Sequence, residues 1–394
     1  MSLLDQILIL RKANIYLQPG DLGASLPYVY GDMTIGGFGA VLPTTLIDTS
    51  NFVYLVADHA IDSITKVYVN GIEQTSGFTI NVANNYEGQG IVATITFTSD
   101  PQGDVSVRCK GKKSGSTLIE NPIDIIEDFL ISRSALASRD FDATTLAMAK
   151  SICSQKSYQM SWFFAEEKNV EEWLMDVLSE VLGSYRVNTD SKLVLLIDRG
   201  TTIEESEIVA HIVAHRDILE GDNGITIHWD LGQVVNRVRF QFKHHWNRAE
   251  FADEYTPSGD LRSQNAYGAK EKVFNLRGVR HTAHLDSFAA VLLMRFALPP
   301  AAGGIASFTA KTFALINAEP LDVFGLSWQY GPSPAETYLN QGYKILNKSY
   351  ILEGIAIEAI DLGEYLLDHN SFAAYKKYDA SQKWGESRLL TLLI

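Results

Sequence analysis

The stretch from Asn169 to Asp198 constrains the fold most, because its hydrophobic period changes halfway along. Asn169 can cap a helix, with Glu172 in capping-box position, and Gly183 follows where a left-handed residue would end that helix. Apolar residues between them recur at spacings of three and four, which places them on one helical face: Val170, Trp173, Leu174, Val177, Leu178, Val181 and Leu182.

The second half of this stretch predicts a β-hairpin. Two strand-like runs, 185–187 and 193–197, are separated by the polar turn Asn188-Thr189-Asp190-Ser191. A helix that leads directly into a hairpin needs a partner layer to bury both apolar faces. We therefore interpret 169–198 as a docking unit in the middle of the fold, with nothing catalytic in it.

The length and charge limit the classes of protein that fit. A chain of 394 residues is long enough for two to four domains, and 46% hydrophobic with 20% charged residues is ordinary for a globular protein. The net charge of −14 argues against nonspecific nucleic-acid binding and against adhesion to an anionic membrane. We predict no transmembrane span, no signal peptide and no membrane insertion by this chain.

An N-terminal β-rich domain is expected over residues 1–115. Short alternating runs follow one another at even spacing over 52–110, as in a small sandwich or barrel, and Asn70-Gly71 marks a hairpin. The basic, Gly- and Ser-containing stretch 110–116 predicts a flexible linker at the end of the domain.

Three further regions follow. Residues 116–200 predict an α+β helix-hairpin domain, in which helices begin at Asn121 and Asp142. Residues 201–300 predict a mixed strand, loop and helix region that ends in an amphipathic helix over 285–298. Residues 301–394 predict a β-rich part that packs with 225–245 as a second barrel. The expected fold class is therefore α+β, β-rich and multidomain, with two β-barrel-like domains and an inserted α+β domain.

One predicted strand carries a basic stripe. From Val238 to Lys243 apolar residues alternate with polar or basic ones. A strand that exposes such residues can form a subunit interface or a solvated face, and the sequence leaves both open. The candidate subunit-interface residues are Arg237, Arg239, Gln241 and Lys243.

The histidines and cysteines do not form a recognisable site. His211 and His215 have the spacing HxxxH but lack the glutamate of the metalloprotease pattern HExxH. His281 and His284 are only two ligands, and Cys109 and Cys153 form no CxxC pair.

The acidic clusters 166–172 and 204–207 fall on predicted polar helix faces or at helix N-termini, where acids are favoured without catalysis. No GxSxG, phosphate-loop or dinucleotide-binding pattern is present. We expect no catalytic, cofactor-binding or metal-binding residues, no cofactor, and a protein that is not an enzyme.

The order of these segments resembles the hub proteins of tailed-phage tail tips and baseplates. The resemblance covers about residues 26–362 and is one of pattern rather than of catalytic signatures. It is carried by a helix after the first β domain, a helix followed by a hairpin, a long strand, and a late amphipathic helix followed by β runs: residues 121–130, 170–178, 192–198, 234–242 and 285–298.

This resemblance implies two β-barrel-like hub domains arranged around an axis as a homotrimer with pseudo-sixfold symmetry. It implies a virion-tail protein, folded in the bacterial cytoplasm, with the chain itself, the tube, the distal tail and a spike or fibre as partners. The expected function is therefore a ring-forming structural adaptor. A glycan- or receptor-binding β protein of the tail tip stays open as an alternative, and a cell-wall hydrolase is less favoured.

Overall fold

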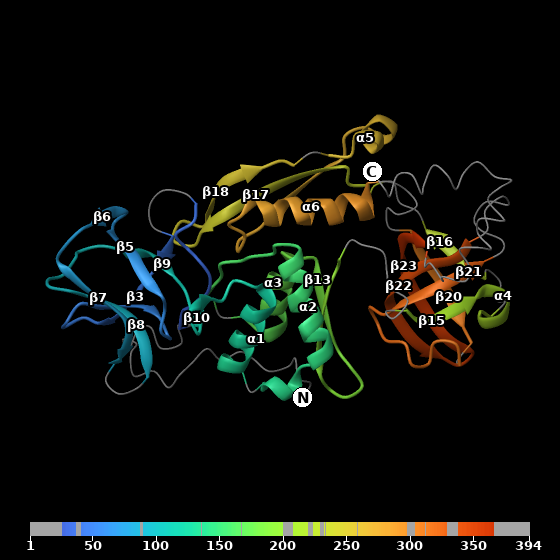
Figure 1. Cartoon of the computed structure of the whole chain (residues 1–394), viewed down its shortest axis with the longest axis horizontal. Coiled ribbons are helices and arrows are strands. Elements are labelled where there is room, and N and C mark those ends of the chain that lie inside the picture. The colour runs from blue at the N-terminus through green and yellow to red at the C-terminus, as the bar shows by residue number, and fades with distance from the viewer. Residues whose placement is uncertain are drawn as a thin grey trace. The chain divides into compact units, whose positions relative to one another are not determined.

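In the computed structural model, the chain divides into two compact units (Figure 1). Unit 1 consists of residues 1–199, 237–264 and 269–291, and unit 2 of residues 200–236, 265–268 and 292–394. The residues that the structure describes are 26–36, 41–86, 90–134, 136–166, 168–199, 208–219, 224–228, 232, 234–257, 259–297, 304–311, 313–328 and 338–365.

Unit 1 begins with a two-sheet β-sandwich. One sheet has the strand order β2-β9-β5-β6 and the other β3-β4-β8-β7, and all neighbours are antiparallel. The hairpin predicted at Asn70-Gly71 joins β5 to β6, and both residues have positive φ, as the tight turn requires. The strands are β2 (Leu42–Pro43), β3 (Thr45–Asp48), β4 (Val53–Ala57), β5 (Ser63–Val69), β6 (Ile72–Gln74), β7 (Phe78–Asn85), β8 (Ile91–Phe97) and β9 (Val105–Lys110).

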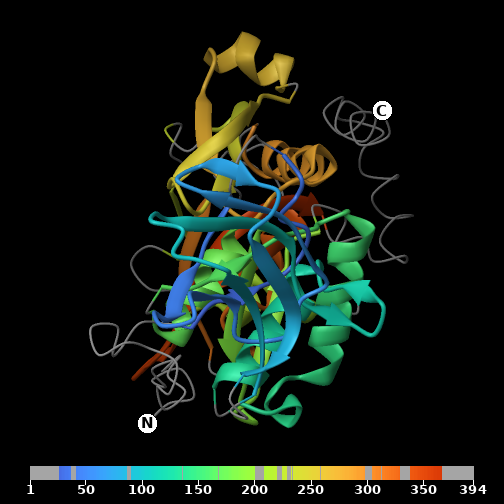
Figure 2. The ribbon, with the colours of Figure 1, turned by 90° about the vertical axis from the view of Figure 1, so that its left-hand side faces the viewer.

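The sandwich core is shared by both sheets. Val56 and Ile95 from one sheet pack with Val67 and Val107 from the other, and all four are fully buried. The expectation of a barrel-like domain is corrected here, because consecutive strands β6 and β7 belong to different sheets and leave both sheets open at that side. Figure 2 shows this sandwich facing the viewer, in blue and cyan.

The stretch predicted as a flexible linker is ordered by pairing. β10 (Lys113–Ser114) and β11 (Thr117–Leu118) form a small hairpin. Its lysines reach carboxylates on other segments, with Lys112 2.7 Å from Asp128 and Lys113 2.7 Å from Asp62. The basic residues that suggested a solvated linker therefore attach this stretch to α1 and to the sandwich.

The helical part of unit 1 begins at the predicted caps. Asn121 caps α1 (Pro122–Arg133) by accepting from the N–H of Ile123, and Asp142 caps α2 (Ala143–Gln155) by accepting from Thr145. A short 3-10 helix over residues 138–140 precedes α2. At the end of α1, buried Arg133 forms an ion pair with buried Asp58 of the sandwich, and this pair ties the two parts together.

The central helix-hairpin unit forms as the sequence predicts. Asn169 and Glu172 make the reciprocal bonds of a capping box at the start of α3 (Val170–Ser179). β13 (Gly183–Val187) and β14 (Leu193–Ile197) then pair as a hairpin.

The end of α3 differs from the prediction. The helix stops at Ser179, and Leu182, not Gly183, takes the left-handed conformation, with φ of 53°. Gly183 is needed for space, because a Cβ there would lie 2.7 Å from Leu178 Cδ2 and 2.9 Å from Ile197 Cδ1. The glycine therefore permits close packing of α3 on β14.

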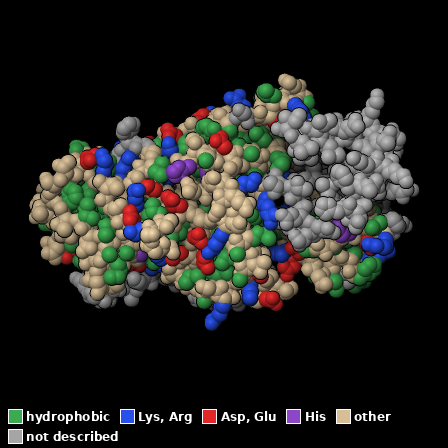
Figure 3. Space-filling view, viewed as in Figure 1, with side chains coloured by type: hydrophobic (Ala, Val, Ile, Leu, Met, Phe, Trp, Pro, Cys, Tyr) green, Lys and Arg blue, Asp and Glu red, His purple; other side chains and the backbone are tan. Residues whose placement is uncertain are grey.

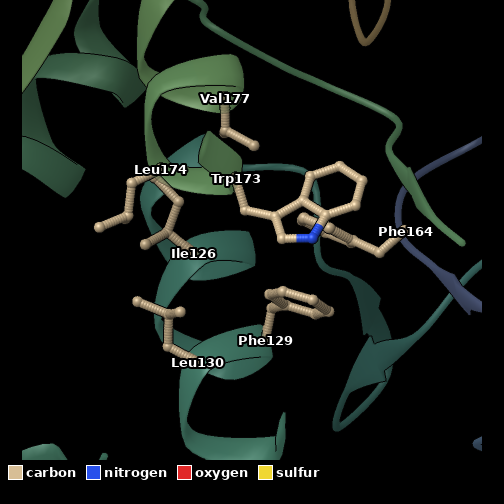
Figure 4. Close-up of a pocket in the computed structure, with 7 residues that line it drawn as sticks. All are labelled: Ile126, Phe129, Leu130, Phe164, Trp173, Leu174 and Val177. Atoms are coloured by element: carbon tan, nitrogen blue, oxygen red, sulfur yellow. The ribbon is translucent and has the colours of Figure 1, made fainter. Parts of the chain in front are cut away.

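Aromatic side chains fill the space between α1, α3 and a pair of short strands, β1 (Tyr28–Val29) and β12 (Phe163–Phe164). Phe129 stacks on Phe164 with ring centroids 3.7 Å apart, and Trp173 meets Phe164 edge-on at 4.7 Å. Figure 4 shows these rings facing one another, with aliphatic residues of both helices around them. This cluster buries the helical face predicted from the sequence.

A three-stranded sheet completes unit 1. β17 (Arg237–His245) lies between β18 (Glu250–Tyr255), antiparallel to it, and β19 (Glu271–Asn275), parallel to it. The helices are α5 (Leu261–Tyr267) and α6 (Thr282–Phe296), and the boundary between the units falls within each of them. The structure differs here from the expected packing of 225–245 with the C-terminal part, because β17 pairs with β18 and β19.

Unit 2 contains a six-stranded sheet in the order β15-β21-β22-β23-β20-β16. β15 lies at one edge of this sheet and is followed by the short α4 (Ala214–Asp217). Ile218, directly after α4, forms a bridge with Ala310 of β20, which is the strand next to the opposite edge. The C-terminal β runs form one open sheet rather than the expected second barrel, and among the described residues of 225–245 only those of β16 join it. The strands are β15 (Ile208–Val213), β16 (Thr226–His228), β20 (Ile305–Ala310), β21 (Val323–Trp328), β22 (Tyr338–Ile351) and β23 (Gly354–Tyr365).

The structure therefore confirms a β-rich α+β multidomain fold. Across the described ranges, no sheet closes into a barrel. The described helices include none that is both long enough and apolar enough to cross a membrane.

Candidate interface on the sheet of strands β17, β18 and β19

The two faces of β17 have opposite character. Val238, Phe240 and Phe242 are buried, and Phe240 meets Phe288 of α6 edge-on at 5.6 Å. The side chains that alternate with them belong to the predicted stripe, Arg237, Arg239, Gln241 and Lys243, and are partly or fully exposed. The alternation of buried and exposed residues along β17 is therefore the one predicted from the sequence.

The stripe is neutralised within its own sheet. Arg237 lies opposite Glu271 in the register, with Nε 3.0 Å from its carboxylate, and the same carboxylate lies 3.2 Å from Nε of Arg239. Arg239 also lies 3.4 Å from Glu254, and Lys243 Nζ lies 2.6 Å from Asp253. The face predicted as basic therefore carries a ladder of positively and negatively charged side chains.

These ion pairs add little to folding stability. The guanidinium-bearing side chains are 39–49% exposed, so solvent screens the pairs. Their chemical consequence is a surface that can match another surface of alternating charge. Figure 3 shows the same interleaving of acidic and basic side chains over the visible described surface.

Lys243 ends the stripe at a backbone irregularity. Its φ is +58°, and its N–H donates to the carbonyl of Val279 instead of continuing the ladder with β18. Its aliphatic stem covers Gly36, where a Cβ would lie 2.1 Å from Lys243 Cδ. Lys243 therefore packs closely against Gly36.

Glu180 has a buried carboxyl group that no sequence pattern indicated. Glu180, just after α3, is 3% exposed and accepts hydrogen bonds from the backbone N–H groups of Arg277 at 2.5 Å and Gly278 at 2.9 Å. Burial raises the pKa of Glu180 to about 8, although the two amide donors favour the ionised form. No local pattern distinguishes this glutamate from the exposed ones beside it in the sequence.

His284 lies between two carbonyl groups. Its Nε2 is 2.8 Å from the carbonyl oxygen of Glu180 and its Nδ1 is 3.1 Å from that of Gln159. A neutral imidazole can donate to only one of them. Burial nevertheless lowers the pKa of His284 to about 4, because it outweighs the two backbone contacts. His284 is thus a packing and hydrogen-bonding residue within unit 1.

The other candidates from the sequence do not come together. His211 lies in β15 and His215 in α4, so the HxxxH pair does not sit on one helix. Cys109 and Cys153 are both buried free thiols. Glu171 and Glu172 lie in the first turn of α3 as expected, Glu166 pairs with Lys168, and the cluster 204–207 lies outside the described residues.

Over the described ranges, no group of three or more histidine, cysteine, aspartate or glutamate side chains is arranged to hold a metal ion. The candidate residues that the structure brings together on one element are those of the β17 stripe.

Comparison with known proteins adds one structural likeness. No protein-family model matches the chain, and no curated protein matches it. Among solved structures, it is similar to the crystal structure of prophage tail protein gp18 from Listeria monocytogenes EGD-e. The two share 10% identity over 89% of this chain and 91% of that one, with a TM-score of 0.33.

Proposed function

We propose that this chain is a structural protein of a phage or prophage tail, and that it acts as a ring-forming adaptor at the tail tip or baseplate hub. In the assembled tail it forms a homotrimer between the tube and a spike or fibre. It acts by shape and docking, and carries out no reaction.

The order of elements along the chain carries this proposal. The tail-hub resemblance anticipates a β domain, a helix, a helix that feeds a hairpin, a long strand, and an amphipathic helix followed by a closing β part. The described structure has the sandwich, α1, α3 with β13 and β14, β17, α6 and the sheet of β20 to β23 in that order. The long strand β17 also carries the four candidate subunit-interface residues predicted from the sequence, on the side chains that alternate with its buried ones.

We further propose that the β17 stripe lies at a subunit boundary. Arg237 and Arg239 share Glu271, and Arg239 also pairs with Glu254, so these two cations face two carboxylates in the free chain. A neighbouring subunit with a similar ladder can approach without burying an uncompensated charge. Charge placement on this face then sets the register of the contact.

A charge swap tests the interface without disturbing the sheet. The double variant Arg237→Glu with Glu271→Arg keeps the ion pair between these two positions but inverts its direction on the surface, and Arg239 loses Glu271 but keeps Glu254 as its carboxylate partner. If the face is a subunit boundary, tails assembled with the double variant are fewer or lack their tip. The matched control is Lys66→Glu with Glu73→Lys, which inverts an exposed pair on the sandwich.

Two measurements separate the outcomes. Thermal unfolding should show that both double variants fold as the parent does, and electron microscopy of particles should show a tip defect for the β17 swap alone. Normal tails with the β17 swap would remove this face from the proposal. A strain lacking the chain that still makes complete tails would contradict the structural role as a whole.

A further inference from the structure

Buried polar atoms without partners gather where β17 ends. Arg280 is 1% exposed, yet its Nε and one terminal nitrogen, Nη1, have no hydrogen-bond partner among the described residues. The same holds for both ring nitrogens of His245, which is 3% exposed, and for the indole N–H groups of Trp162 and Trp246. Buried polar groups are nearly always satisfied, so such a group of atoms calls for a ligand.

The cluster of these side chains draws on three segments of unit 1 that contact one another, and His245 lies near enough to Arg280 to be affected by its charge. The other terminal nitrogen of Arg280, Nη2, donates to the carbonyl of His244 at 2.8 Å. The ring of His244 lies 5.0 Å from that of Trp246, which lies 5.6 Å from Trp162. The end of β17, the connection from β19 to α6 and the run before β12 therefore meet here.

The free atoms are chiefly donors. Guanidinium and indole N–H groups can only donate, and each imidazole can offer at least one N–H. A water molecule in such surroundings could accept but would find few acceptors for its own hydrogens. An anion, which only accepts, matches these atoms better.

The charge of the cluster points the same way. Within the described part of the chain, no carboxylate forms an ion pair with Arg280. Burial lowers the pKa of Arg280 to about 10, while Glu180 and Asp32 at longer range favour its charged form. Burial also lowers the pKa of His245, and the nearby cations Arg280, Arg108 and Arg248 add to that effect. A buried cation without a direct counterion is costly, and a bound anion would remove the cost.

We propose that this cluster binds a small oxyanion. Arg280 supplies the charge, and the indole groups of Trp162 and Trp246 and the imidazole of His245 supply further donors. The site holds together three segments that come from distant parts of the sequence, so an anion there acts as a structural ligand. This inference is independent of the tail-assembly role.

Calorimetric titration with inorganic phosphate and with sulfate, against sodium chloride at equal ionic strength, tests the proposal. The purified chain should bind phosphate or sulfate saturably. Arg280→Met should weaken that binding at least about tenfold, because a charge-assisted donor pair is lost. Arg237→Met, which removes an exposed guanidinium of β17, should change it less than about twofold.

A second readout does not depend on the folding of the arginine variant. The chain has six tryptophans, and their indole N–H signals can be followed by NMR during a phosphate titration. Two signals should shift saturably, and Trp162→Phe and Trp246→Phe should each remove one of them. Signals that move only in proportion to ionic strength, or equal binding by Arg280→Met, would overturn the proposal.

Discussion

Nε2 of His284 lies 2.8 Å from the carbonyl oxygen of Glu180, and this contact joins the first turn of α6 to the residue that follows α3. The carboxylate of the same glutamate accepts from the N–H groups of Arg277 and Gly278. Glu180 thus binds the segment 277–284 with both its backbone and its side chain. The sheet of β17 and the helix-hairpin unit are held together at this point.

The first prediction concerns alkaline pH. The pKa of Glu180 is raised from its ordinary 4.5 to about 8, so the folded chain holds this proton more tightly than the unfolded chain. The corresponding stability is full below about pH 4.5 and is lost as pH rises through about 8. Glu180→Gln cannot titrate. The free energy of unfolding of both proteins can be measured by urea denaturation. The difference, Glu180→Gln minus parent, should increase by ~2–4 kcal/mol from pH 5 to pH 9, because only the parent loses stability there.

Glu172→Gln is the matched control, because Glu172 is exposed on α3 and glutamine can keep the capping box. Its stability should follow the parent at every pH. Parallel pH curves for Glu180→Gln and the parent would show that the buried carboxyl group does not hold its proton.

The second prediction concerns acidic pH. The pKa of His284 is lowered from 6.5 to about 4, so the folded chain keeps the ring neutral where the unfolded chain protonates it. The stability that this neutral ring allows is present above pH 6.5 and is lost as pH falls through about 4. His284→Gln retains a donor for the Glu180 carbonyl but does not titrate. Between pH 7 and pH 4 it should therefore lose about 2 kcal/mol less than the parent. An equal loss in both proteins would contradict the assignment.

The third prediction concerns the buried ion pair of Arg133 and Asp58, whose side chains are 6% and 0% exposed. Asp58→Asn leaves a buried guanidinium, which also lies 4.1 Å above the ring of Tyr28, without its counterion. We expect a loss of about 3–5 kcal/mol in the free energy of unfolding. Asp58→Asn combined with Arg133→Met should cost less than the sum of the single changes. Strict additivity in this double-mutant cycle would refute direct coupling.

The fourth prediction concerns the aromatic cluster shown in Figure 4. Trp173 is 1% exposed and contacts Phe164 and Phe129, so Trp173→Ala should reduce the free energy of unfolding by about 3–5 kcal/mol. Met175, on the same helix and 50% exposed, provides the control. Met175→Ala should stay within about 0.5 kcal/mol of the parent. A similar effect of both changes would mean that this face of α3 is not part of the core.

Local chemistry made much of this fold predictable. Asn169 with Glu172 and Asn70 with Gly71 each specify a cap or a turn through their own backbone and side-chain geometry, and both form as expected. The alternation along β17 likewise placed Arg237 and Arg239 on the open face.

Partners across long sequence distances were not predictable. Nothing near Arg237 indicates that Glu271 lies beside it, since that pairing depends on a parallel strand that arrives after β18 and α5. Glu180 and Arg280 read locally as ordinary surface residues, and they become buried only because the 277–284 segment folds back onto α3. The sequence pattern for β17 could not reveal which sheet it joins, because alternation specifies a face and leaves the neighbouring strand undetermined.

Cryo-electron microscopy of assembled particles would show the arrangement of the subunits itself. The proposed hub role predicts three copies of the chain in a ring at the tip end of the tube, with the β17 stripe of each copy at a subunit boundary. Particles that lack the chain, or that carry it as single copies with Arg237 and Arg239 facing solvent, would contradict it.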